Sequence, residues 1–117
     1  MELTAKQINE DGGILGREVQ VIGLDGKGAP DDSVTAYKKL VEEEGVSAVV
    51  GTNFSSCNIA IAAVADELKV PVIATAASNE LVTVDADGKL HPYSFRLCFI
   101  DSYMGYLAGS YSDNELG

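Results

Sequence analysis

Residues 46–78 read VSAVVGTNFSSCNIAIAAVADELKVPVIATAAS and contain two short apolar runs, VSAVV and VPVIA. Such runs are typical of strands that are buried on both faces of a sheet. Between them, apolar residues recur near helical spacing, and the charged residues Asp66, Glu67 and Lys69 are expected to point outward. The stretch therefore predicts a right-handed strand-helix-strand unit with parallel strands.

Each predicted strand ends in a cluster of small polar residues. In parallel sheets, ligands bind beyond the carboxyl ends of the strands, and these ends meet at one edge. We therefore expect a binding edge built from both clusters, which consist of Thr52, Asn53, Ser55 and Ser56 after the first strand and of Thr75, Ser78 and Asn79 after the second.

Two roles are open for Ser55 and Ser56. Either hydroxyl can cap the helix by accepting a hydrogen bond from a free backbone N–H group of its first turn. Alternatively, the free N–H groups and the positive end of the helix dipole hold a carboxylate or a phosphate group. Two adjacent polar turns favour a ligand, because a cap requires only one hydroxyl per helix.

The composition indicates one soluble globular domain. The chain has 117 residues, of which 46% are hydrophobic, and no apolar run approaches the length of a membrane helix. The formal net charge is −10, from 18 acidic and 8 basic residues, which argues against nucleic acid or an anionic membrane as a partner. The chain starts with a polar helical segment, so the signal of an exported protein is not expected among these residues.

The segments before residue 46 predict two helices and a strand. Residues 1–11 form an amphipathic pattern, and the glycine pair that follows can end a helix with a left-handed cap. Residues 19–24 read as a strand. Pro30 suits the first turn of a helix that continues to Gly45.

The segments after residue 78 predict a strand and a final helix. Residues 93–99 alternate as an edge or late strand. Asp101 or Ser102 can cap a final helix that ends at Gly117. Helices and strands alternate along most of the chain, so the predicted fold class is α/β, a doubly wound, mainly parallel sheet with helices on both faces.

No residue pattern indicates an enzyme, a metal or a cofactor. Cys57, His91 and scattered carboxylates are available, and none lies in a catalytic motif. His91 precedes Pro92 beside a turn and is expected to be exposed without a special role. Cys57 and Cys98 lack metal-ligand spacing and are expected to be core thiols, while a bridge between them stays open.

An ordered series of short segments runs along nearly the whole chain. It comprises residues 8–17 (INEDGGILGR), 38–41 (KKLV), Gly45 and Val46, Val50 and Gly51, Ser55 and Ser56, 70–73 (VPVI), 76–78 (AAS) and 93–96 (YSFR) before Asp101 and Gly105. In this order and spacing they resemble the type I periplasmic binding-protein family, in particular the branched-chain amino-acid branch that serves ABC importers.

The resemblance implies two doubly wound lobes that close over an amino acid, with residues 1–117 as part of the N-terminal lobe. In similar proteins the groups at these positions hold the ligand's main-chain atoms. Ser55 and Ser78 would donate their hydroxyls to the α-carboxylate, Ser78 would add its N–H, and the carbonyl of Ala76 would accept from the α-ammonium group. The positions that would bear on side-chain selectivity are Asn53, Phe54 and Asn79.

The resemblance also implies a role and a location. The whole protein would be an extracytoplasmic solute-binding protein, periplasmic or at the cell surface, and lipid-anchored in a Gram-positive organism. It would pass a branched-chain or related amino acid to an ABC permease. A ligand-sensing domain of a signalling receptor has the same fold, and these residues do not separate transport from sensing.

The sequence departs from the family pattern at both ends. Family members place a strand before the first helix, between the strands of residues 19–24 and 46–50 in the sheet, and they continue into a second lobe after the last helix. Without the first strand, its two neighbours either leave a gap with unpaired backbone groups or pair directly. We therefore expect copies of the chain to associate by exchanging elements or by pairing strand edges.

Overall fold

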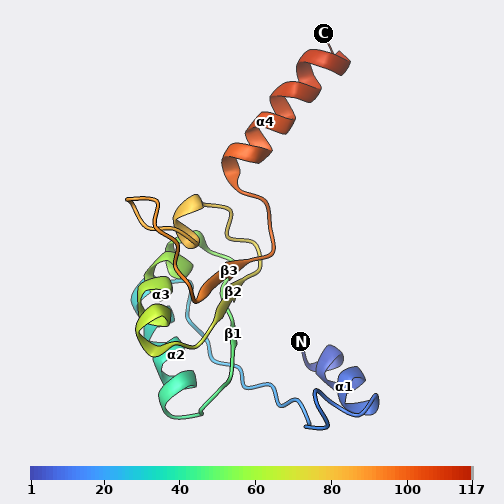
Figure 1. Cartoon of the computed structure of the whole chain (residues 1–117), viewed down its shortest axis with the longest axis vertical. Coiled ribbons are helices and arrows are strands. Elements are labelled where there is room, and N and C mark those ends of the chain that lie inside the picture. Colours follow the sequence, from blue (N-terminus) through green and yellow to red (C-terminus); the bar gives the residue numbers. More distant parts are fainter. Residues whose placement is uncertain (117) are drawn as a thin grey trace.

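The computed structural model describes residues 1–116 (Figure 1). Its helices are α1 (Glu2–Glu10), α2 (Pro30–Glu42), α3 (Ser55–Leu68) and α4 (Asp101–Tyr111), and its strands are β1 (Val49–Val50), β2 (Val72–Ala74) and β3 (Ser94–Arg96). A 3-10 helix, Glu80–Val82, follows β2, and a π-helical turn, Ser112–Leu116, follows α4. The predicted end of the last helix at Gly117 lies outside the described residues.

The three strands form one parallel sheet in the order β1-β2-β3. Helix α3 connects β1 to β2, which confirms the predicted parallel strand-helix-strand unit. Strand β3 pairs with β2 at the edge of this sheet, as its alternating pattern predicted. The fold is therefore α/β with a parallel sheet.

Helices α2 and α3 cover one face of the sheet (Figure 1). The strand register aligns Val49 with Val72 across β1 and β2, and both side chains are buried against Tyr37 of α2 and Ile61 of α3. Full burial of an aliphatic side chain of this size contributes roughly 1.5–3 kcal/mol. This single apolar layer forms the main core.

The neighbouring row of the sheet faces solvent. Val50, Ile73 and Phe95 are aligned across the three strands, and the first and last of them are 44% and 50% exposed. Successive side chains of a strand point to opposite faces, so this row lies away from α2 and α3. Within residues 1–116, no helix covers this second face, whereas the sequence pattern predicted helices on both faces.

The predicted strand at residues 19–24 is wrong. Within residues 1–116, the backbone groups of residues 20–24 form no backbone–backbone hydrogen bond. Val19 instead pairs with the side chain of Asn9 in α1, its N–H donating to Oδ1 at 2.7 Å and its carbonyl accepting from Nδ2 at 2.9 Å. A cavity of about 230 Å³ lies between Leu24 and β1. The segment therefore has no neighbouring strand with which to form a ladder, although its apolar pattern suits a strand.

Helix ends follow the glycine and proline signals better than the hydroxyl signals. Gly12 and Gly13 follow α1 with φ of +100° and +76°, and Pro30 opens α2, as predicted. The predicted side-chain caps are wrong, because the residues before α3 and α4 make no capping hydrogen bond. Ser55 and Asp101 are instead the first residues of these helices.

Asp66 and His91 join α3 to the loop before β3. Nδ1 of His91 lies 2.6 Å from Oδ2 of Asp66, and the N–H of Tyr93 donates to Oδ1 of the same carboxylate at 3.2 Å. The side chain of His91 is only 17% exposed, and that of Asp66 is 27% exposed. The predictions that Asp66 points outward and that His91 is exposed are therefore wrong.

Helix α4 extends away from the body of the molecule (Figure 1). None of its residues is buried, and the radius of gyration is 16.9 Å, whereas a compact chain of this length has about 13 Å. Cys98, on the segment that leads to α4, is partly exposed, Cys57 is buried in α3, and both thiols are free. In residues 1–116, every helix is too short or too polar to cross a lipid bilayer.

We predict that Tyr37→Phe lowers the free energy of unfolding by roughly 1–3 kcal/mol, because the Tyr37 hydroxyl donates to the carbonyl of Val70 at 2.5 Å. Burial and, secondly, the charge of Asp66 raise the pKa of Tyr37 above its ordinary value of 10.0. The folded state thus holds this proton more tightly than the unfolded state. The contribution is complete below pH 10 and declines as the pH rises through the raised pKa.

Denaturant titrations at several pH values measure this difference, with the exposed Tyr106→Phe as control. A constant difference between wild type and Tyr37→Phe from pH 8 to the alkaline limit of folding would contradict the assignment.

Candidate functional site

The two polar turns meet at the carboxyl edge of β1 and β2. The hydroxyl of Thr75 donates to Oδ1 of Asn53 at 2.6 Å, and the N–H of Asn79 donates to the hydroxyl of Ser55 at 3.3 Å. Each bond joins one turn to the other. The structure therefore brings together the two clusters that the sequence placed after separate strands.

The six proposed ligand-binding residues differ in exposure. Ser55 and Ser78 are half-buried, so part of each residue still reaches the surface. The four exposed residues are Asn53, Phe54, Ala76 and Asn79. The site is an open edge, with two half-buried serines flanked by more exposed residues.

The first turn is shaped by Asn58, a residue that the sequence reasoning missed. Nδ2 of Asn58 donates to the carbonyls of Thr52 and Phe54, at 2.8 and 2.9 Å. Its Oδ1 is buried and has no hydrogen-bond partner within the described chain. A Cβ added to Gly51 would lie 2.6 Å from this oxygen, so only glycine fits against the buried amide.

The second turn is held by Arg96. Nη1 donates to the carbonyls of Ser78 and Asn79, at 3.3 and 2.8 Å, and Nη2 donates to the carbonyl of Glu80 at 3.0 Å and to the hydroxyl of Thr83 at 2.6 Å. The sequence analysis included Arg96 only as part of the segment at residues 93–96, one of those that resemble the family. Its partners are 13 to 18 residues away, so no local spacing predicts this fork.

The electrostatics of the edge suit a carboxylate. Helix α3 begins at Ser55 and has 14 residues and no acidic side chain in its first turn, in contrast to α2, which begins with Asp31 and Asp32 after its proline. The unpaired N–H groups of such a helix start attract negative charge. Serine hydroxyls and these N–H groups can donate to a carboxylate, while the Ala76 carbonyl can accept from an ammonium group.

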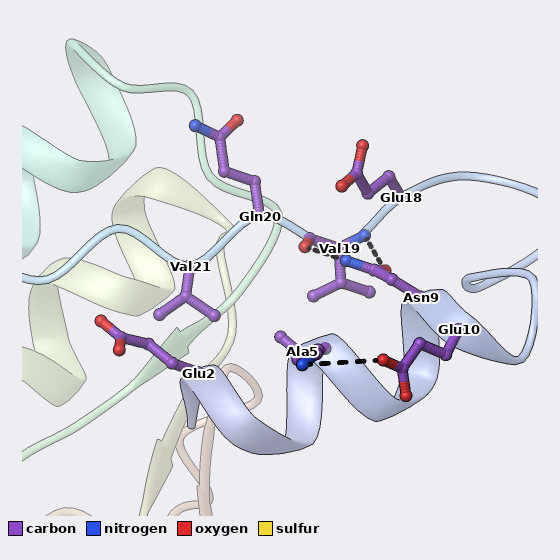
Figure 2. Close-up of a pocket in the computed structure, with 9 residues that line it drawn as sticks. Glu2, Ala5, Asn9, Glu10, Glu18, Val19, Gln20 and Val21 are labelled. Atoms are coloured by element: carbon purple, nitrogen blue, oxygen red, sulfur yellow. Dashed lines mark hydrogen bonds and ion pairs between the residues drawn. The ribbon is translucent and has the colours of Figure 1, made fainter.

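Two cavities lie elsewhere in the molecule. The larger, of about 620 Å³, separates α1 from residues 18–21. Polar groups around it pair with one another: Figure 2 shows Asn9 bound to the backbone of Val19, and Lys6 forms an ion pair with Glu10. The 230 Å³ cavity reaches only Thr52 and Phe54 of the polar edge. We place the candidate site at the open edge, because the polar groups there converge, whereas the cavities arise where α1 and residues 18–28 stand away from the core.

Comparison with known proteins gives a consistent picture. A family model described as periplasmic binding protein matches residues 1–113. An amino acid binding protein of Pseudomonas aeruginosa is 32% identical over 112 residues, which cover 96% of this chain and 29% of that protein.

Two solved structures share the fold. One is the branched-chain amino acid transporter substrate-binding protein LivJ of Streptococcus pneumoniae in complex with isoleucine, with a TM-score of 0.85, 31% identity and coverage of 98% of this chain and 32% of that chain. The other is the leucine-binding protein LivK of Thermotoga maritima, with a TM-score of 0.77, 31% identity and coverage of 94% and 30%. The chain thus spans about a third of the length of these relatives.

The parallel sheet, the two joined turns and the match over residues 1–113 agree with the resemblance that the sequence motifs indicated. This chain belongs to the periplasmic binding-protein family.

Proposed function

We propose that this chain supplies one wall of an amino-acid site in an extracytoplasmic solute-binding protein that serves an ABC permease. The observation on which this proposal rests is the pair of hydrogen bonds that joins the two turns, Thr75 to Asn53 and Asn79 to Ser55. They hold Ser55 and the segment at Ser78 at one edge, beside the start of α3. The relatives support the ligand class, since LivJ was solved with isoleucine.

The ligand's main-chain groups would bind at the half-buried Ser55 and Ser78 and at the exposed Ala76. Ser55 and Ser78 donate their hydroxyls to the α-carboxylate, the N–H of Ser78 adds a third donor, and the carbonyl of Ala76 accepts from the α-ammonium group. The Ser55 hydroxyl already accepts from Asn79, so its own proton is free to point at the ligand. This arrangement recognises the groups that all amino acids share.

The ligand's side chain would meet the exposed residues. Asn53, Phe54 and Asn79 surround the edge, and Phe54 is 59% exposed. An exposed aromatic ring beside a polar site suits contact with an aliphatic side chain. We therefore propose a branched-chain or related amino acid as the ligand, with residues 1–117 as part of the first of two lobes.

We predict that Ser55→Ala and Ser78→Ala each weaken leucine binding by the whole protein about tenfold or more. Charge-assisted hydrogen bonds contribute roughly 1.5–3 kcal/mol, and tenfold in affinity corresponds to about 1.4 kcal/mol. In the double variant, the fold-loss of leucine affinity is expected to be smaller than the product of the two single fold-losses, because both hydroxyls hold the same carboxylate. Isothermal titration calorimetry measures the affinities.

Ser47→Ala is the matched control, because Ser47 is an exposed serine that precedes β1, at the end of the sheet opposite to the site. It should leave the affinity within about twofold. Unchanged leucine binding in Ser55→Ala would remove this residue from the site, and wild-type binding of sugars in place of amino acids would refute the proposed ligand class.

We predict that residues 1–117 alone bind leucine more weakly than millimolar, whereas the whole protein binds it in the micromolar range or better. The edge is open, so a ligand there stays hydrated on one side and its ammonium group gains no opposing carboxylate. The same calorimetric titration applies. Micromolar binding by the isolated chain would show that one wall is sufficient.

We also propose that the isolated chain associates with copies of itself. The free edge of β1 faces the 230 Å³ cavity, and residues 20–24 on the far side of this cavity have no ladder partner within residues 1–116. Val50 and Phe95 add an exposed apolar row on the sheet. Exposed strand edges and apolar faces of this kind favour pairing between chains.

Light scattering at tens of micromolar is expected to give at least the mass of a dimer for residues 1–117. Val50→Lys should lower the association, because it puts a charge on the exposed row next to the free edge, whereas Leu90→Lys, at an exposed position in a distant loop, should not. A monomer mass for the wild-type chain, together with a cooperative melt, would refute self-association.

A further inference from the structure

The peptide segment that begins at Ser78 is held through its carbonyl groups. Arg96 is the last residue of β3 and lies in register with Ala74, the last residue of β2. Its guanidinium donates to the carbonyls of three successive residues, Ser78, Asn79 and Glu80. Three carbonyls bound to one rigid planar group cannot rotate independently. Arg96 therefore determines the direction in which the N–H groups of this turn point.

The same segment connects to the other half of the site. The Asn79 residue donates its N–H to the Ser55 hydroxyl at 3.3 Å and accepts at its carbonyl from Arg96 at 2.8 Å. A continuous chain of hydrogen bonds thus runs from the guanidinium through one residue to the first hydroxyl of α3. A shift of Arg96 would change the relative positions of Ser55 and Ser78.

Arg96 also shares a partner with the start of α4. The carbonyl of Ser78 accepts from the N–H of Asp101 at 3.0 Å as well as from Arg96, and the Ser102 hydroxyl donates to Oε1 of Glu80 at 2.5 Å. The turn at residues 78–80 is therefore the place where the base of the projecting helix α4 is attached to the body.

We infer that Arg96 is a positioning residue for amino-acid binding, acting through the turn at residues 78–80 without touching the ligand. This inference rests on the proposed function of Ser55 and Ser78. Lysine cannot replace Arg96, because an ammonium group is not a planar fork. It can bind only some of the four acceptors, which are spread over residues 78–83. The turn therefore requires the planar shape of the guanidinium group as well as its positive charge.

The test compares leucine affinity in the whole protein carrying Arg96→Lys, Ser78→Ala or both. Arg96→Lys should weaken binding about tenfold although the charge is kept. The double variant should bind about as weakly as Ser78→Ala alone, because a displaced turn no longer presents the missing hydroxyl. Effects that multiply in the double variant would mean that Arg96 acts on the fold in general, and would overturn the inference.

Arg17→Lys is the matched control, since Arg17 is the other arginine of the chain and its side chain is exposed. It should leave the affinity unchanged.

If Arg96→Lys fails to fold, Thr83→Val keeps the guanidinium and removes only its 2.6 Å contact with the Thr83 hydroxyl. A loss of several-fold in leucine affinity would support the inference, and wild-type affinity in this variant would overturn it.

Amide hydrogen exchange separates this inference from the proposed function. In Arg96→Lys, the N–H of Asn79 should exchange at least several times faster than in wild type, because its hydrogen bond to Ser55 depends on a fixed turn. Unchanged exchange would refute the positioning role even if leucine binds. Failure of the wild-type protein to bind any amino acid, together with faster exchange in the variant, would refute only the proposed ligand.

Discussion

Parallel pairing between β1 and β2 is the constraint from which the site follows. The N–H groups of Val49 and Gly51 donate to the carbonyls of Pro71 and Ile73, both at 2.9 Å. Because the strands run in the same direction, the chain leaves both at the same edge, and the connecting helix α3 has to begin there. The polar turns, the helix start and the hydroxyl of Ser55 are therefore neighbours for a topological reason, before any ligand is considered.

The burial of the sheet on one face explains much of the remaining structure. Tyr37 and Ile61 of α2 and α3 complete a core with Val49 and Val72, while Val50 and Phe95 on the other face stay exposed. A strand needs a ladder partner as well as an apolar pattern. The segment at residues 19–24 has side chains that suit a strand, but it has no such partner within residues 1–116 and its backbone is irregular. Helix α4 likewise has an apolar surface with no buried residue.

Long-range hydrogen bonds position the functional edge, and they were the least predictable feature. Local rules left two roles open for Ser55, a helix cap or a ligand-binding hydroxyl, and neither predicts that this hydroxyl accepts from Asn79, 24 residues away. No sequence pattern singled out Asn58, although it donates to two carbonyls of the preceding turn. Arg96 and His91 likewise find their partners on other elements, and only the packed fold brings these groups within hydrogen-bond distance.

The sequence by itself determined the parallel strand-helix-strand unit and the helices at Pro30 and before Gly12, because these depend on periodicity and on backbone preferences that act over a few residues. The family came from a resemblance in the order and spacing of short segments along the chain. The candidate edge was also predictable, since polar residues after buried strands meet at one end of any parallel sheet. Only the tertiary structure decided which hydroxyl is free, which arginine fixes the turn and which apolar segment finds a ladder partner. Each of these depends on the distance in space between residues far apart in sequence, and local propensity does not contain that distance.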